Sequence, residues 1–161
     1  MSHDNVTPFR KRRPPPKQAR QGPPLSTHRG KAVAVQLLAL LVGVCDLWPL
    51  GAIYLGLWAP PPMLLSLLGL AAAIAGFFIA MSNRQGAMPW AATHHEFALR
   101  SIIVAVCASM LGSVLGFVMF LGMLGLALSI LGAIWIVVRS GYGLVRAALR
   151  LPMLRPTGWL L

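Results

Sequence analysis

Few residues in this sequence could do chemistry, and the first of them is an acidic residue inside an apolar stretch. Asp46 lies within residues 32–62, where Gln36 is the only other strongly polar side chain. An ionisable group inside a membrane span is by default a candidate functional residue. At about 1.5 Å per residue, Asp46 lies about 22 Å beyond Lys31, closer to the far interface than to the middle of a membrane. A cap near Pro49 is the simpler interpretation, and a proton or cation relay, which needs a chain of such groups, is the alternative.

The string His94-His95-Glu96 suggests metal binding, but its spacing does not fit. A zinc site on a helix uses ligands four residues apart on one face, whereas adjacent histidines point in different directions. The sequence also lacks a Gly-rich phosphate loop, a Ser-His-Asp set and paired carboxylates. We therefore expect a polar, interfacial entry to a helix here, with no metal, no cofactor and no enzymatic activity.

The composition excludes a soluble protein. Of 161 residues, 57% are hydrophobic and 11% are charged, where a soluble domain carries about 25% charged residues. Eight of the fourteen Lys and Arg residues fall within residues 1–31, so the rest of the chain has too few charges to cover a surface in water. Both a soluble enzyme and a free nucleic-acid-binding domain are excluded, and an integral membrane protein remains.

Apolar runs and their interruptions predict four membrane helices. Residues 63–81 carry no charge and span about 28 Å, while residues 101–138, also uncharged, would be about 57 Å long and must fold back. The first span either tilts or kinks at Pro49, or ends near Gly51. The expected segments are a disordered basic Pro-rich tail (1–31), helices at 32–57 and 63–81, an interfacial loop (82–96), helices at 97–116 and 122–140, and a basic amphipathic C-terminal segment (141–161).

Charge asymmetry predicts the orientation of these helices. Every Lys and Arg lies in the tail, near the loop at 82–96 or in the C-terminal part, and the turns near 60–62 and 116–122 have none. Because cytoplasmic segments of membrane proteins are enriched in Lys and Arg, both termini are expected in the cytoplasm. The expected fold is an all-α integral membrane protein with four transmembrane helices in two hairpins.

Small residues recur at helical spacing in three spans. Gly112 and Gly116 form a G-x-x-x-G pair, a pattern that lets helix backbones approach closely in lipid. We expect these faces to pack within the bundle, and docking onto a partner's helix is the alternative. The candidate packing residues are Gly69, Ala73, Gly76, Gly112, Gly116, Gly125, Ser129 and Gly132.

Basic residues outside the spans are expected to contact anionic lipid head groups. Each Lys or Arg near the membrane surface contributes about 1 kcal/mol of attraction. An acidic protein partner is the alternative, and nucleic acid is not expected, because the tail has one aromatic residue and no fold to present it. Three arginines at the end of the last span and after it lie on one face of an expected continuation of that helix, which Pro152 would stop. The candidate head-group contacts are Arg10, Lys11, Arg12, Arg13, Arg139, Arg146 and Arg150.

Two motifs in the second half of the chain resemble a known group of proteins. The string His94-His95-Glu96-Phe97-Ala98-Leu99-Arg100-Ser101 resembles the H-x-x-F-x-I-R-T hairpin entry of small, uncharacterised bacterial inner-membrane proteins. The C-terminal part is similar to that group's R-x-x-x-G-L and P-x-x-x-P-x-x-W-L motifs, in the strings Arg139-Ser140-Gly141-Tyr142-Gly143-Leu144 and Pro152-Met153-Leu154-Arg155-Pro156-Thr157-Gly158-Trp159-Leu160-Leu161. The group is distantly similar to the four-helix superfamily that includes a chloroplast inner-envelope translocon component. The resemblance covers residues 93–161, implies a bacterial inner-membrane location and implies no activity.

The sequence therefore predicts a non-catalytic accessory or scaffold subunit that contacts the lipid bilayer and other membrane protein subunits. A transporter or channel element acting as an oligomer is the alternative. Polar residues in the spans are too sparse for a hydrophilic path through one chain: Gln36, Asp46, Ser66, Ser109, Ser113 and Ser129.

Overall fold

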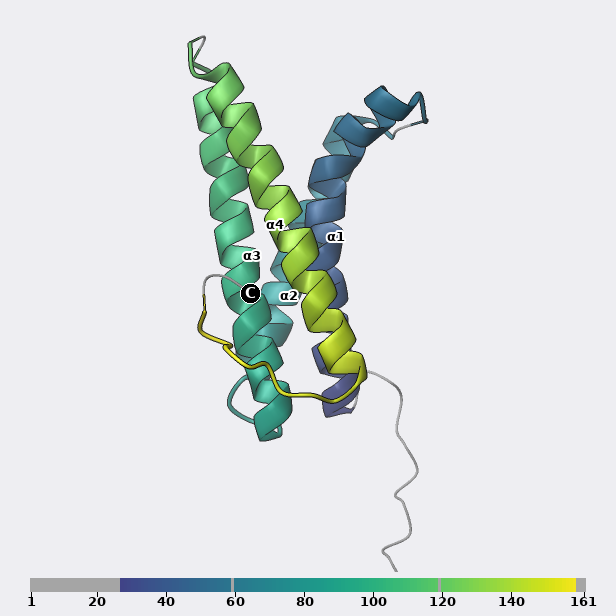
Figure 1. Ribbon diagram of the computed structural model, residues 1–161, viewed down its shortest axis with the longest axis vertical. Helices are drawn as coiled ribbons and strands as arrows, with labels where there is room; N and C mark the ends of the chain where they lie inside the picture. Colours follow the sequence, from purple (N-terminus) through teal and green to yellow (C-terminus); the bar gives the residue numbers. More distant parts are fainter. Residues whose placement is uncertain (1–26, 59, 119, 159–161) are drawn as a thin grey trace, which may run out of the picture.

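The computed structural model contains four α-helices and describes residues 27–58, 60–118 and 120–158 (Figure 1). The helices are α1 (His28–Leu55), α2 (Pro62–Asn83), α3 (Pro89–Gly116) and α4 (Gly122–Ala148). No residue in these ranges belongs to a strand. Each helix is long and apolar enough to cross a membrane. The all-α architecture with four candidate membrane helices, predicted from the sequence, is confirmed.

Local sequence signals explain where the helices begin and end. Thr27 caps α1, because its Oγ1 accepts a hydrogen bond of 3.0 Å from the Gly30 amide. Gly56 ends α1 at φ 62° and ψ 26°, a left-handed conformation that glycine adopts without steric cost. Helices α2 and α3 begin at Pro62 and Pro89, where the missing proline N–H costs no intrahelical hydrogen bond.

One expected helix boundary was wrong, the start of α3. Helix α1 ends at Leu55, close to the expected end at residue 57, and it continues through Pro49 with its last turns leaning away from α4 (Figure 1). The segment 82–96 was expected to be a loop, yet α3 already begins at Pro89. The polar side chains of His94 and His95 in its first turns are buried inside the bundle. Helix α4 runs to Ala148, past the expected end of the membrane span near residue 140 and into the segment expected to be amphipathic, and the chain leaves it where Arg150 takes φ 58°.

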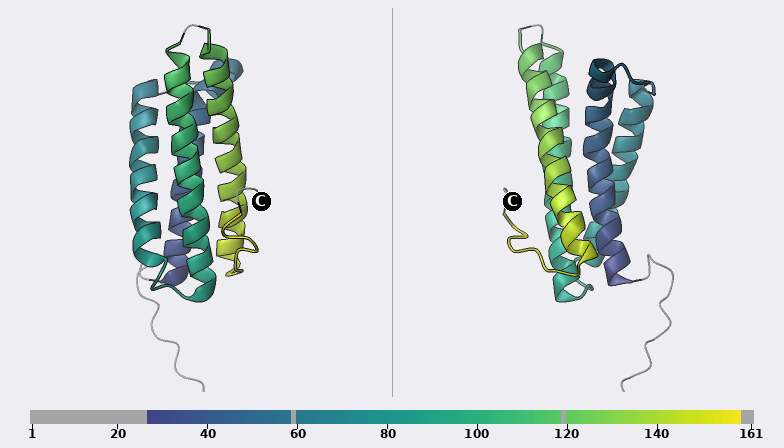
Figure 2. Two further views of the ribbon diagram at one scale, coloured as in Figure 1. Left: turned by 90° about the vertical axis from the view of Figure 1, so that its left-hand side faces the viewer. Right: turned by 45° about the vertical axis from the view of Figure 1, so that its right-hand side comes forward.

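Helices α1 and α3 each contact the other three helices, whereas the described residues of α2 and α4 are not in contact. Figure 2 shows α3 and α4 side by side along their length, with the C-terminal segment beside their lower part. The ends of α1 and α2 near residues 56–61 diverge from the ends of α3 and α4 near residues 117–121 (Figure 1). This divergence leaves α3 free to face α1 and α2 across a pocket.

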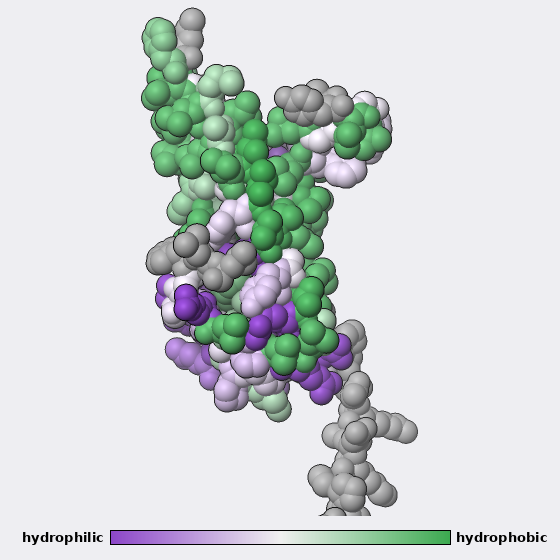
Figure 3. All heavy atoms as spheres, viewed as in Figure 1, coloured by the Kyte–Doolittle hydropathy of each residue, from purple (hydrophilic) through white to green (hydrophobic). Residues whose placement is uncertain are grey.

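The interior is small and the outer surface is apolar. A cluster of buried, mostly small side chains joins the four helices: Ala39, Val42, Ala72, Ala73, Ile102, Ala105 and Ile136. Large apolar side chains such as Phe78, Met110 and Leu131 face outward, each 65% exposed. Hydrophilic residues gather at one end of the molecule (Figure 3). A surface of this kind suits lipid contact along the helices and water at the polar end.

Candidate functional site

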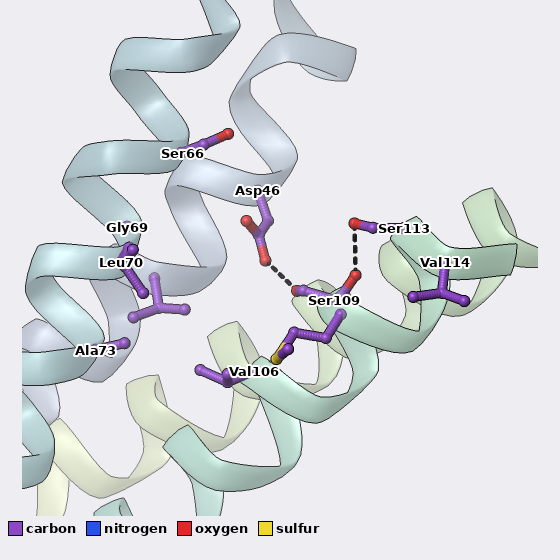
Figure 4. Close-up of a pocket in the computed structure, with 11 residues that line it drawn as sticks. Asp46, Ser66, Gly69, Leu70, Ala73, Val106, Ser109, Ser113 and Val114 are labelled. Atoms are coloured by element: carbon purple, nitrogen blue, oxygen red, sulfur yellow. Dashed lines mark hydrogen bonds between the residues drawn. The ribbon is translucent and has the colours of Figure 1, made fainter. Parts of the chain in front are cut away.

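Helices α1 and α3 hold Asp46 in a hydrogen-bonded position between them. The Ser109 hydroxyl donates a hydrogen bond of 2.8 Å to Asp46 Oδ2, and the Ser113 hydroxyl donates one of 2.8 Å to the Ser109 carbonyl (Figure 4). Asp46 is half-buried. Its partner is therefore a serine 63 residues away on another helix, and not a local backbone group near Pro49. The interpretation of Asp46 as a local cap does not describe this arrangement.

A pocket of about 400 Å³ adjoins Asp46 and Ser109. Its polar lining consists of these two residues, Ser66 of α2 and Ser113 of α3, and Figure 4 shows Asp46 and Ser113 on facing helices across the open space. The remaining lining is apolar or small: Val42, Gly69, Leu70, Ala73, Val106, Met110 and Val114. Because Met110, Ser113 and Val114 are exposed, the pocket reaches the outer surface of the bundle.

A second pocket continues the first along α2 and α3. It measures about 280 Å³, is lined by apolar side chains and Cys107, and shares Leu70, Ala73 and Val106 with the pocket at Asp46. We call the two together the α2–α3 groove. Val42 and Ala73 belong both to the polar pocket and to the buried apolar cluster, so the floor of the groove toward the interior is apolar.

Comparison of the chain with protein-family models, with characterised proteins and with solved structures finds no match. The resemblance of residues 93–161 to a group of bacterial membrane proteins stays a prediction. The interpretation of the site therefore rests on its geometry.

Arg139 occupies a buried site at the polar end of the bundle, which corrects its expected role as a lipid head-group contact. Its side chain is 1% exposed, and its guanidinium carbon lies 3.8 Å from the centre of the Phe97 ring. Arg139 Nε donates a hydrogen bond of 2.8 Å to Ser101 Oγ, and Nη2 donates one of 2.6 Å to the Gly158 carbonyl. The C-terminal segment folds back over α3 and covers this arginine, so its guanidinium joins parts of the protein instead of reaching lipid.

His94, His95 and Gln36 are also fully buried, although the two histidines were expected at a polar interface. His94 Nε2 donates to the Leu151 carbonyl at 2.8 Å, since a carbonyl only accepts, and Gln36 Nε2 donates to the His94 carbonyl at 3.3 Å. Neither ring nitrogen of His95 has a partner among the described residues. No group of three His, Cys, Asp or Glu residues suited to a metal ion occurs in the part of the chain that the structure describes.

From the sequence, Gln36 was named only as one of the few polar residues in the spans, and in the structure it packs against a glycine of α4. A Cβ atom at Gly143 would lie 2.7 Å from Gln36 Cδ, so a side chain there would force the buried amide to shift. The available signal was that Gln36 is the one amide in an otherwise apolar stretch. A buried amide of this kind needs a hydrogen-bond partner and a space of its own size.

The C-terminal segment, residues 149–158, is a strap across the start of α3. The Met153 amide donates a hydrogen bond of 3.0 Å to Thr93 Oγ1, and the Met153 side chain is buried. Arg146 Nε donates to the Pro152 carbonyl at 3.1 Å, while Arg150 is exposed. Of the expected head-group contacts, Arg146 and Arg150 thus keep access to the surface, and Arg10 to Arg13 lie outside the described residues.

The small residues of α3 and α4 pack against each other within the bundle. A Cβ at Gly112 would lie 2.7 Å from the Gly125 carbonyl oxygen and in conflict with Ser129, and a Cβ at Gly132 would lie 2.8 Å from Ala108. Gly116 differs from the expected pattern, because nothing lies within 4 Å of the position of its Cβ.

The small residues of α2 face α1 and α3. A Cβ at Gly69 would lie 3.2 Å from Cys45 Cβ, one at Gly76 would lie 2.8 Å from Ile102 Cδ1, and Ala73 is buried. With the exception of Gly116, these small residues are therefore used in packing the four helices, and Gly69 and Ala73 line the groove as well.

Proposed function

We propose that this protein is a non-catalytic accessory or scaffold subunit that binds another membrane protein. One observation carries the proposal: the Asp46 carboxylate lies in a pocket that reaches the apolar outer surface of the bundle. A polar group in such a position is costly in hydrocarbon unless a partner covers it. Besides the Ser109 hydroxyl and the Asp46 carboxylate that it binds, the pocket lining has no His, Lys or Arg that could complete a catalytic set, so binding is the chemistry that we propose for it.

The proposal includes a membrane arrangement of two helical hairpins, α1 with α2 and α3 with α4, with both termini in the cytoplasm. The described Lys and Arg residues belong to the polar end of the molecule, and the connections 56–61 and 117–121 contain none. This asymmetry supports a cytoplasmic polar end. Residues 93–161 resemble bacterial inner-membrane proteins, and we therefore place the protein in that membrane.

The proposal also includes contacts of basic residues with lipid head groups and proteins at the membrane surface. Arg146 and Arg150 lie at the polar end, where anionic head groups are within reach. The tail, with Arg10 to Arg13, would add to this attraction. We propose lipid and protein contacts for these residues and no role in nucleic-acid binding.

An oligomeric transporter or channel element is the second candidate, and Asp46 is the observation that favours it. An intramembrane carboxylate can hold or relay a cation. The floor of its pocket is apolar, however, where Val42 and Ala73 join the buried cluster. A polar path would therefore have to run between subunits.

Crosslinking in native membranes tests the proposed function. After crosslinking, the protein is purified in several mild detergents and its neighbours are identified by mass spectrometry. We expect the same membrane protein to co-purify in each detergent and to appear in the crosslinked product. A protein that purifies alone in every detergent, with no consistent crosslinked neighbour, would contradict the proposal and make transport the leading hypothesis.

A further inference from the structure

We propose that the α2–α3 groove receives a transmembrane helix of a partner protein, and that a lysine or arginine on this helix pairs with Asp46. This inference rests on the proposed function, because it names the chemistry by which the subunit would recognise its partner. Shape, charge and the small residues of the groove each contribute to it.

The groove has the length of a helical contact. Its lining runs from Ser66 to Phe78 on α2 and from Ile102 to Val114 on α3. Twelve residues of helix span roughly 18 Å, or more than three helical turns. The occupant is therefore elongated and mostly apolar. The small residue Ala73 lies in both pockets and lets a neighbouring helix approach closely.

Among elongated, apolar occupants, the negative charge of Asp46 favours one that carries a positive charge. Ser109 donates a hydrogen bond to the carboxylate but supplies no positive charge. The nearest basic residue along α3 is Arg100, nine residues and about 13 Å before Ser109. A cation from outside the chain would compensate a carboxylate in this setting, because opposite charges attract most strongly where water is excluded.

The other occupants fit less well. A lipid acyl chain matches the apolar lining but offers no hydrogen-bond donor or charge to Asp46. A second copy of this chain has no Lys, Arg or His among residues 101–138 or 47–83, so it would bring no cation to this level. A small cation would leave most of the elongated groove empty. A helix with one basic residue satisfies both the apolar lining and the carboxylate.

Site-specific photo-crosslinking in native membranes tests the inference. A photoreactive residue is placed at Met110 in the groove or at Leu131 on α4, two positions with the same 65% exposure. We expect capture from Met110, and a captured apolar segment that contains a Lys or Arg. Asp46→Asn should lower this yield at least fivefold, because it removes the charge and keeps the side-chain shape. Glu96→Gln, which removes a negative charge at the polar end, should change the yield less than twofold.

A further pair of variants separates charge pairing from a structural role of Asp46. Ser109→Ala removes the hydrogen bond between α1 and α3 but keeps the carboxylate, and Asp46→Glu keeps the charge. If Asp46 acts by pairing with a partner, both variants should retain at least half of the crosslinking yield. If Asp46 only joins the helices, Ser109→Ala should lose as much as Asp46→Asn, which would overturn the inference.

The remaining outcomes distinguish this inference from the proposed function. Capture of a second copy, capture of lipid alone, or capture of a segment without a basic residue would each overturn the charge-paired helix. A neighbour captured only from Leu131 would also overturn it and leave the accessory-subunit proposal standing. If neither position captures a protein and chemical crosslinking also finds no neighbour, both proposals fail.

Discussion

Gly112 of α3 and Gly125 of α4 face each other in direct backbone contact, and neither has room for a side chain. A Cβ at Gly112 would lie 2.7 Å from the Gly125 carbonyl oxygen, and a Cβ at Gly125 would conflict with the Gly112 carbonyl oxygen. Contact of this kind lets the two backbones pack by dispersion without the gap that side chains would impose. The relationship explains why α3 and α4 stay together where the other helices diverge (Figure 1).

The first prediction concerns this contact. Gly112→Ala should lower the free energy of unfolding by about 1–3 kcal/mol, because the backbones must move apart to admit the methyl group. Gly116→Ala is the matched control, since its Cβ would meet nothing within 4 Å, and it should change stability by less than about 1 kcal/mol. Thermal unfolding in detergent and the amount of protein in membranes measure both. Equal effects of the two substitutions would contradict the packing that the structure shows.

A second prediction concerns Gln36 and Gly143. Gly143→Ala should destabilise the protein by about 1–3 kcal/mol, because the new methyl group would press on the buried amide of Gln36. Gly141→Ala, two residues earlier in α4, should have little effect, since nothing lies within 4 Å of its Cβ position. Thermal unfolding of each variant measures the difference.

A double-mutant cycle shows whether the clash is with Gln36 itself. Gln36→Ala removes the amide and makes room for the methyl group, so Gly143→Ala should cost less in that background than in the natural chain. We expect a coupling of about 1 kcal/mol or more. Additive effects of the two substitutions would place the strain elsewhere.

Much of the helical architecture could be predicted, because it depends on signals that are local in the sequence. The uncharged run at 63–81 and the prolines at 60–62 indicate α2 and its start, and the length of the run at 101–138 requires a turn. The start of α3 was misplaced, since polarity in residues 89–96 was taken as a sign of a loop. Buried hydrogen bonds across helices make that polarity compatible with a helix inside the bundle.

The partners of the candidate site residues could not be predicted, because they depend on how each helix is rotated. Asp46 was identified from its charge, but Ser109 is one of several serines, and spacing does not indicate which one faces α1. Arg139 was assigned to the surface because basic residues usually lie there, and its burial depends on the strap that returns as far as Gly158. Gly116 shares a face with Gly112 in sequence, yet only at Gly112 does the position of the missing Cβ point into the neighbouring helix.

The third prediction concerns the orientation in the membrane. In a variant with both native cysteines replaced, Gly86→Cys lies in the connection between α2 and α3, where nothing crowds its side chain, and Phe120→Cys lies in the opposite connection at a position 94% exposed. A membrane-impermeant maleimide added to intact spheroplasts should label Phe120→Cys at once. Gly86→Cys should react only after the membrane is permeabilised, because the proposed orientation places the basic end in the cytoplasm. Labelling of Gly86→Cys alone in intact spheroplasts would reverse the orientation.

The last prediction concerns Arg139 and the strap. Arg139→Ala should lower the free energy of unfolding by about 3 kcal/mol, because it removes hydrogen bonds from a charged group and the contact with the Phe97 ring. Arg139→Lys should recover part of this loss, since an ammonium keeps the charge but not the planar fork that reaches both Ser101 and Gly158. Arg84→Ala is the control, because its ion pair with Glu96 is 4.0 Å long and lies near the surface, where such pairs contribute at most about 1 kcal/mol.

A proteolysis experiment then shows whether Arg139 holds the strap in place. The bond after Arg150 lies at the start of the strap, next to the Leu151 carbonyl that His94 binds. In purified protein, trypsin should release the fragment that begins at Leu151 at least fivefold faster from Arg139→Ala than from the natural chain or from Arg84→Ala. The reason is that loss of the bond to the Gly158 carbonyl frees the far end of the strap and raises the population of the open form. Unchanged release from a destabilised Arg139→Ala protein would mean that Arg139 stabilises the packing of α3 on α4 and that Met153 and His94 hold the strap without it.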